Sequence, residues 1–118
     1  MGEVEYFDQK IETSSRDEMA VLQFQKLETL LKKVYATNRF YQNKLDSVGI
    51  TPSEVRSVDD LYKLPFTVKK EFEEDQDKNP IFGTNLTEPL ENYVQYHQTS
   101  GTTGKPLKFL DFLYSLIF

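Results

Sequence analysis

A run of glycine, hydroxyl and lysine residues between two alternating segments constrains this chain more than any other feature. The run Thr99–Pro106 holds two glycines, four hydroxyl side chains and one lysine. Before it, Asn92–Gln98 is aromatic and β-branched, and after it Leu107–Leu110 alternates in the same way. Such segments predict strands. We therefore expect a β-hairpin from about Asn92 to Leu110, with the glycine-rich run as its turn.

The residue types of this turn are those that bind phosphate groups. Glycines allow positive φ angles, turn backbone N–H groups toward one point and let a bulky oxyanion approach closely. Hydroxyls donate hydrogen bonds, and a lysine supplies a mobile positive charge. A surface turn rich in the same residues is the alternative that this composition leaves open. The candidate phosphate-binding residues, called the glycine loop below, are Thr99, Ser100, Gly101, Thr102, Thr103, Gly104 and Lys105.

The glycine loop is not a Walker A motif. That motif needs four residues between its glycines and a Ser or Thr directly after its lysine. Here Gly101 and Gly104 are closer together, and Pro106 follows Lys105. The flanking strands also differ from the strand and helix that surround a Walker A loop. His97, the only histidine, lies on the first strand, where a local hydrogen bond is a simpler role than general-base chemistry.

The part of the chain before the hairpin is expected to be helical. Ser15 followed by Glu18 forms a capping box, and a helix from there should end near Thr37–Asn38. A second helix should run from about Arg39 to Gly49, a residue suited to a left-handed cap. The apolar stripe of the first helix consists of Ala20, Phe24, Leu27, Leu31 and Val34, continued by Asn38.

Shorter elements are expected between the second helix and the hairpin. Thr51–Glu54 has a helix-start pattern that needs only one turn, and Ser57 should cap a helix that Pro65 forbids from continuing. A short helix should run from Thr67 through Phe72. The segment from Gln76 to Glu91 is the candidate linker. An acidic run, interpreted as solvated surface in preference to a metal site, comprises Glu71, Glu73, Glu74, Asp75 and Asp77.

Several segments besides the loop have the character of one protein family. They are Tyr6-Phe7-Asp8, Ile11-Glu12, Val34-Tyr35, Phe40-Tyr41, Leu45, Gly49 and, above all, Leu61-Tyr62-Lys63-Leu64-Pro65-Phe66-Thr67. Together with the glycine loop followed by Lys-Pro, they resemble the amino-terminal region of phenylacetate-CoA ligases, which belong to the adenylate-forming superfamily. The resemblance runs from about Tyr6 to Leu110.

The resemblance implies a fold and an activity. The fold is α/β for the large domain of such enzymes, and α+β for the piece present here, a helical part followed by the hairpin with its phosphate loop. The activity is ATP-dependent activation of a carboxylic acid as an acyl-adenylate, followed by transfer to coenzyme A, with Mg²⁺ accompanying ATP. Residues 1–111 would be the amino-terminal portion of the AMP-binding domain. The family's catalytic and metal-binding groups lie further along its sequence and match nothing here, so we assign none, and Lys105 is not the catalytic lysine.

Composition excludes several classes of function. A net charge of -5 argues against a nucleic-acid partner, which needs a clustered basic face. The absence of cysteine excludes disulfides, thiolate metal sites and a cysteine nucleophile. The acidic start Met1–Glu5 is unlike a signal peptide, which favours a cytoplasmic location.

The last residues, 112–118, form an apolar tail. They are too few to span a bilayer, which takes roughly 20 residues, and they resemble an aggregation-prone segment that would favour homo-oligomers. We interpret the chain as a truncated piece or the product of a disrupted gene, with a tail unrelated to the family sequence, and expect it to be inactive alone. Two alternatives stay open: a non-catalytic nucleotide-binding module, and a helical interaction module whose stripe from Ala20 to Val34 docks a partner.

Overall fold

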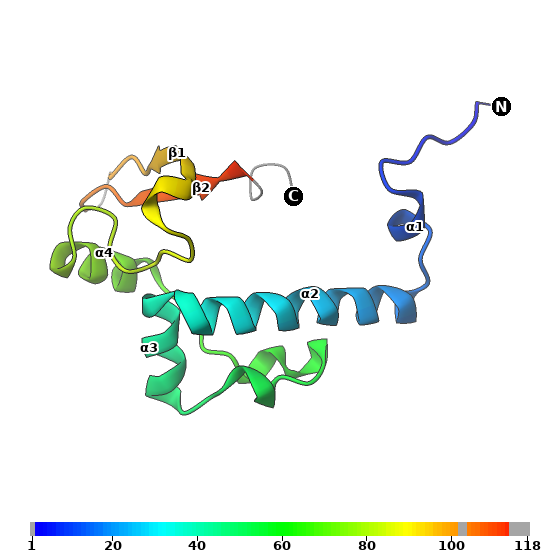
Figure 1. Ribbon diagram of the computed structural model, residues 1–118, viewed down its shortest axis with the longest axis horizontal. Coiled ribbons are helices and arrows are strands. Elements are labelled where there is room, and N and C mark those ends of the chain that lie inside the picture. Colours follow the sequence, from blue (N-terminus) through cyan, green and yellow to red (C-terminus); the bar gives the residue numbers. More distant parts are fainter. Residues whose placement is uncertain (1, 102–103, 114–118) are drawn as a thin grey trace.

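The computed structural model describes residues 2–101 and 104–113 of the chain. A long helix α2 forms the axis of the molecule; α4 and the hairpin lie on one side of it, and the segment after α3 lies on the other (Figure 1). The elements in chain order are α1 Gln9–Glu12, α2 Arg16–Thr37, α3 Arg39–Val48, η1 Pro52–Glu54, η2 Val58–Lys63, α4 Lys69–Lys78, η3 Leu90–Asn92, β1 Tyr93–Gln98 and β2 Lys108–Phe112.

The first long helix, α2, begins at the expected capping box. Ser15 Oγ accepts the N–H of Glu18 at 3.2 Å, and the Glu18 carboxylate accepts the N–H of Ser15 at 2.9 Å. The helix ends at Thr37, as predicted, because Asn38 leaves helical geometry. Of the expected stripe, Leu31 is buried among the described residues.

The next helix, α3, also follows its local signals. Asn38 caps it by accepting the N–H of Tyr41 at 3.1 Å, and Gly49 ends it with a φ of +72°, in the left-handed region. Phe40 on this helix stacks on Phe72 of α4 with ring centroids 4.8 Å apart. That contact joins the two helices.

Two predictions between α3 and the hairpin need correction. Ser57 was expected to cap a helix, but the element is a 3-10 helix in which Ser57 makes no side-chain cap bond. Asp60 instead accepts the N–H of Arg56 at 2.8 Å. The helix expected to end at Phe72 is α4, which continues to Lys78. Spaced lysine–glutamate pairs support its acidic second half, among them Lys69 with Glu73 at 3.6 Å.

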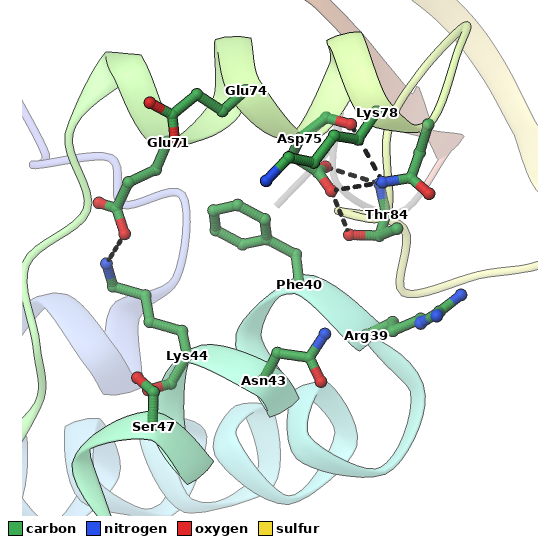
Figure 2. A pocket seen from close by; sticks show the side chains of 11 residues that line it. Arg39, Phe40, Asn43, Lys44, Ser47, Glu71, Glu74, Asp75, Lys78 and Thr84 are labelled. Atoms are coloured by element: carbon green, nitrogen blue, oxygen red, sulfur yellow. Dashed lines mark hydrogen bonds and ion pairs between the residues drawn. The ribbon is translucent and has the colours of Figure 1, made fainter.

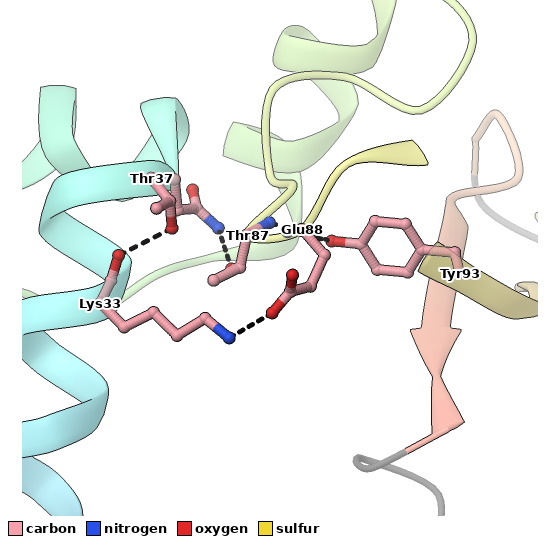
Figure 3. Close-up of polar contacts among 6 residues, drawn as sticks. Lys33, Thr37, Thr87, Glu88 and Tyr93 are labelled. Atoms are coloured by element: carbon pink, nitrogen blue, oxygen red, sulfur yellow. Dashed lines mark hydrogen bonds and ion pairs between the residues drawn. The ribbon is translucent and has the colours of Figure 1, made fainter. Parts of the chain in front are cut away.

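The segment from Gln76 to Glu91 is an ordered connection and not a linker. Its first residues complete α4, and the remainder is tied to the helices by side chains. Thr84 donates its N–H and its hydroxyl to the Asp75 carboxylate, at 2.7 and 2.6 Å. Glu88 forms an ion pair with Lys33 of α2 (Figure 3). The hairpin that follows is therefore fixed in place relative to α2 and α4.

Strands β1 and β2 form the expected antiparallel hairpin. Gln98 lies opposite Lys108, Tyr96 opposite Leu110, and the register shifts near the open end, where Tyr93 meets Phe112. The boundary expected after residue 111 therefore falls within β2. Whether the tail belongs to the family sequence stays a prediction.

The core is small for a chain of this length. The buried apolar side chains among the described residues are Leu31, Leu45, Val55 and Leu107. The radius of gyration is 17.5 Å, against about 13.5 Å for a compact chain of this length. No helix within the described part of the chain has both the length and the apolar character needed to cross a membrane.

Candidate functional site

The glycine loop is closed at its base by a pair of hydrogen bonds. The N–H of Thr99 donates to the carbonyl of Leu107 at 2.9 Å, and the N–H of Leu107 donates to Thr99 Oγ1 at 2.8 Å. Leu107 is buried, so the base is anchored in the core. Thr99, predicted as a phosphate-binding residue, thus uses an oxygen lone pair to close the loop and keeps its hydroxyl proton available to a ligand.

Gly101 has the conformation that the sequence predicted for a glycine of this loop. Its φ is +67°, and its carbonyl accepts the N–H of Gly104 at 3.3 Å. A β-carbon at Gly101 would lie 2.9 Å from Pro106 Cγ and 3.0 Å from the Gly104 carbonyl oxygen. The turn therefore requires glycine at position 101. The Glu73 carboxylate lies 3.4 Å from where a β-carbon of Gly104 would be, so the two glycines have different surroundings.

The remaining loop residues differ in how they are engaged. Ser100 is exposed. Thr102 and Thr103 lie outside the described residues. Lys105 Nζ donates to Asp77 Oδ1 of α4 at 2.8 Å. This hydrogen bond raises the pKa of Lys105, so the ammonium stays charged, and because the pair is exposed a stronger anion can displace the carboxylate.

A cavity of about 560 Å³ lies between the loop's carboxyl-terminal side and α4. Its lining includes Lys105 and Lys108 from the hairpin and Glu73 and Asp77 from the helix. The charges of both signs are close together, so an incoming anion would meet two ammonium groups and two carboxylates. An anion that binds in this cavity would therefore require Lys105 to exchange Asp77 for the ligand.

His97 has a local partner. Its Nε2 lies 2.6 Å from the Asp111 carboxylate of β2, across the hairpin. The histidine and the aspartate bridge neighbouring strands on an exposed face. This contact agrees with a structural role for His97.

The acidic run of α4 is distributed over local pairs. Lys44 of α3 pairs with Glu71, and the Asp75 carboxylate is occupied by Thr84, at opposite ends of a cavity of about 410 Å³ (Figure 2). Lys44 lowers the pKa of Glu71 through its hydrogen bond. Within the described residues, no group of three or more carboxylates and histidines is placed to hold a metal ion.

Sequence reasoning missed three polar side chains that place the hairpin. Asn38 is buried and donates its amide to Asn85 Oδ1 at 2.8 Å and Thr87 Oγ1 at 3.1 Å. The Tyr93 hydroxyl accepts the N–H groups of Thr87 and Glu88, at 2.9 and 3.1 Å (Figure 3). The third is Gln76, which contacts the backbone of β2. In the sequence, Asn38 lies at a predicted helix end and in line with the apolar stripe, and neither position indicates these distant hydrogen bonds.

Comparison with known proteins gives several matches and no match to a family model. The chain is 41% identical over 96 residues to phenylacetate-coenzyme A ligase of Escherichia coli (strain K12), which covers 81% of this chain and 21% of that protein. It is 36% identical over 100 residues to the phenylacetate-coenzyme A ligase of Thermus thermophilus, covering 85% of this chain and 21% of that protein.

The fold matches a solved ligase. A crystal structure of 2-hydroxyisobutyryl-CoA ligase in complex with 2-HIB-AMP and CoA superposes with a TM-score of 0.80 and 27% identity, over 87% of this chain and 22% of that one. The resemblance to phenylacetate-CoA ligases and the expected fold are therefore confirmed, and the chain spans about a fifth of the length of the proteins it matches.

Proposed function

We propose that this chain, similar in sequence to phenylacetate-coenzyme A ligases, is the phosphate-binding section of an AMP-forming carboxylate–CoA ligase. In this proposal the glycine loop holds the phosphate groups of ATP. The observation that carries the proposal is the identity of 33–41% to ligases of one activity, over 81–85% of this chain. The acid substrate would be phenylacetate or a related aryl or acyl carboxylic acid.

The described loop residues fit a phosphate group. Ser100 is exposed and directly precedes the turn at Gly101. The ammonium of Lys105 is held charged by an exposed carboxylate that it can leave for a ligand. The Thr99 hydroxyl proton adds a further donor at the loop base. Charged and hydroxyl donors on a turn of this kind stabilise negative charge where pyrophosphate would leave.

ATP, Mg²⁺ and coenzyme A would act together in the whole ligase. ATP activates the carboxylic acid as an acyl-adenylate, and coenzyme A then takes the acyl group. The described residues offer no carboxylate cluster for a metal ion, so Mg²⁺ would arrive with ATP. The structural neighbour was solved with CoA and an acyl-AMP, which supports both as ligands of the proposed ligase.

We expect the chain to be unable to catalyse ligation by itself. Adenylation depends on positioning and on charge stabilisation from several directions, and the chain supplies one loop. Large apolar side chains that a complete domain would cover are exposed, including Phe66 at 95% and Tyr62 at 81%. The chain should therefore bind phosphate groups weakly and accelerate nothing. We also propose that it acts in the cytoplasm, because a chain without cysteine fits a reducing compartment.

A chimeric enzyme tests the proposal. The 96 aligned residues of the Escherichia coli ligase would be replaced by the matching residues of this chain, and phenylacetate-dependent exchange of labelled pyrophosphate into ATP would be measured. We expect exchange in the chimera, a clear loss with Lys105→Ala, and no exchange from this chain alone. A folded chimera without exchange would contradict the proposal and favour a non-catalytic binding or interaction module.

A further inference from the structure

We propose that Gln76 of α4 is a positioning residue that holds the carboxyl-terminal arm of the glycine loop. The inference rests on the proposed function, because it assigns Gln76 to the same loop. Gln76 lies in the last turn of an acidic helix and has no charge, so the sequence around it gives no sign of a role.

The evidence is a two-point contact with the backbone of β2. Gln76 Nε2 donates to the carbonyl of Lys108 at 2.7 Å, and the N–H of Lys108 donates to Gln76 Oε1 at 3.1 Å. A carboxamide that both donates to and accepts from one residue satisfies the backbone as a neighbouring strand would. The same Nε2 lies 3.4 Å from the Phe82 carbonyl, which adds a weaker link to the turn after α4.

The contact falls on the outer edge of β2. In an antiparallel pair, the backbone groups of successive residues face the partner strand and then away from it. Leu107 is bonded to Thr99, so the groups of Lys108 face away from β1. The base of the glycine loop is therefore held by β1 on its inner edge and by Gln76 on its outer edge.

Two other residues of α4 approach the same arm from the same helix face. Asp77 holds Lys105, and the Glu73 carboxylate lies 3.4 Å from where a β-carbon of Gly104 would be. Residues three and four positions apart share a helix face. The Asp77 side chain is 53% exposed and the Glu73 side chain 29%, whereas the Gln76 hydrogen bonds are partly buried. Gln76 is thus the contact on this face that fixes the arm when Lys105 leaves Asp77 for a phosphate.

Fixing the arm matters because a two-stranded hairpin has little stability of its own. Without Gln76, the arm of the loop would sample several positions over α4, and the conformational entropy lost on ordering it would weaken ligand binding. With Gln76, the arm that carries Lys105 is held in one arrangement before the ligand arrives. The expected consequence is tighter phosphate binding with no contact between Gln76 and the phosphate.

The test uses the whole chain labelled with nitrogen-15 and inorganic pyrophosphate as the probe. Gln76→Met keeps the length of the side chain and removes both hydrogen bonds, while Gln23→Met makes the same change at an exposed position of α2. We expect Gln76→Met to move the amide signals of Gly101 and Gly104 and to weaken pyrophosphate binding roughly tenfold, because two modest hydrogen bonds are lost. Gln23→Met should change neither.

A measurement on the unchanged chain keeps the proposal testable if Gln76→Met does not fold. The Lys108 amide should exchange with solvent at least about tenfold more slowly than an unbonded amide. Free exchange at Lys108 would overturn the proposal, and so would moved loop signals with unchanged pyrophosphate affinity in Gln76→Met. If the unchanged chain binds no pyrophosphate, the proposed function fails. The role of Gln76 is then tested by the amide signals of the loop alone: unmoved signals in Gln76→Met overturn that role, and moved signals support it.

Discussion

Replacing Asn38 with alanine should destabilise this chain more than the loss of an ordinary helix cap. Asn38 Oδ1 accepts the N–H of Tyr41, a cap worth about 1 kcal/mol. Its amide also donates to Asn85 and Thr87, and each of these hydrogen bonds contributes about 1 kcal/mol net. Because Asn38 is only 3% exposed, water cannot replace the lost partners. We expect Asn38→Ala to lower the free energy of unfolding by about 3 kcal/mol.

The matched control is Ser15→Ala, which removes an exposed cap at the start of α2. That change should cost about 1 kcal/mol. Urea unfolding of both variants, followed by circular dichroism, gives the two differences under the same conditions. An equal cost for the two variants would refute the reasoning, since Asn38 would then act as a cap alone and would not tie α2 to the segment before β1.

Three further predictions concern the loop, the pH response and the tail. Gly101→Val should reduce the pyrophosphate affinity measured by titration, because it forces a positive φ on a branched residue beside Pro106. Gly2→Val is the control and should have no effect, because Gly2 has open space around it. Equal affinities of the two variants would be inconsistent with the loop geometry. Lysine partners lower the pKa of Glu71 and Glu88 below 4.5, so the stability from these two ion pairs is present above that pH and is lost as pH falls through the lowered values. The urea concentration at the unfolding midpoint should therefore drop below about pH 4.5, and should drop less in Glu71→Gln. A midpoint that does not change with pH would contradict a stabilising role for the two ion pairs. Deleting residues 113–118 should reduce the oligomers and aggregates seen in size-exclusion chromatography. Deleting Phe112 as well should weaken the hairpin, because Phe112 pairs with Tyr93. A clean monomer before and after the deletion would argue against an effect of the apolar tail.

Local signals account for what the sequence predicted of the fold. The capping box at Ser15, the left-handed residue Gly49 and the alternation on both sides of the glycine loop each act within a few residues, and each element lies where expected. The length of α4 was underestimated because its support comes from spaced charge pairs such as Lys69 with Glu73. The acidic composition of the segment indicated solvated surface and not the spacing of these lysine–glutamate pairs.

Contacts between distant residues account for what was missed. Gln76 reaches Lys108, and Asn38 reaches Asn85 and Thr87, over separations that no local pattern encodes. In the candidate site, the sequence indicated the donor types of the glycine loop but not that Asp77 would hold Lys105. That pairing depends on how α4 packs against the hairpin.

Titration of the chain with pyrophosphate, followed by the amide signals of a nitrogen-15 sample, tests the central claim most directly. We expect weak, saturable changes at Gly101 and Gly104, smaller changes in Lys105→Ala, and no difference in Lys26→Ala, which removes an exposed lysine of α2. Changes spread evenly over the chain, or equal affinities in Lys105→Ala and the unchanged protein, would contradict a phosphate-binding role for the glycine loop.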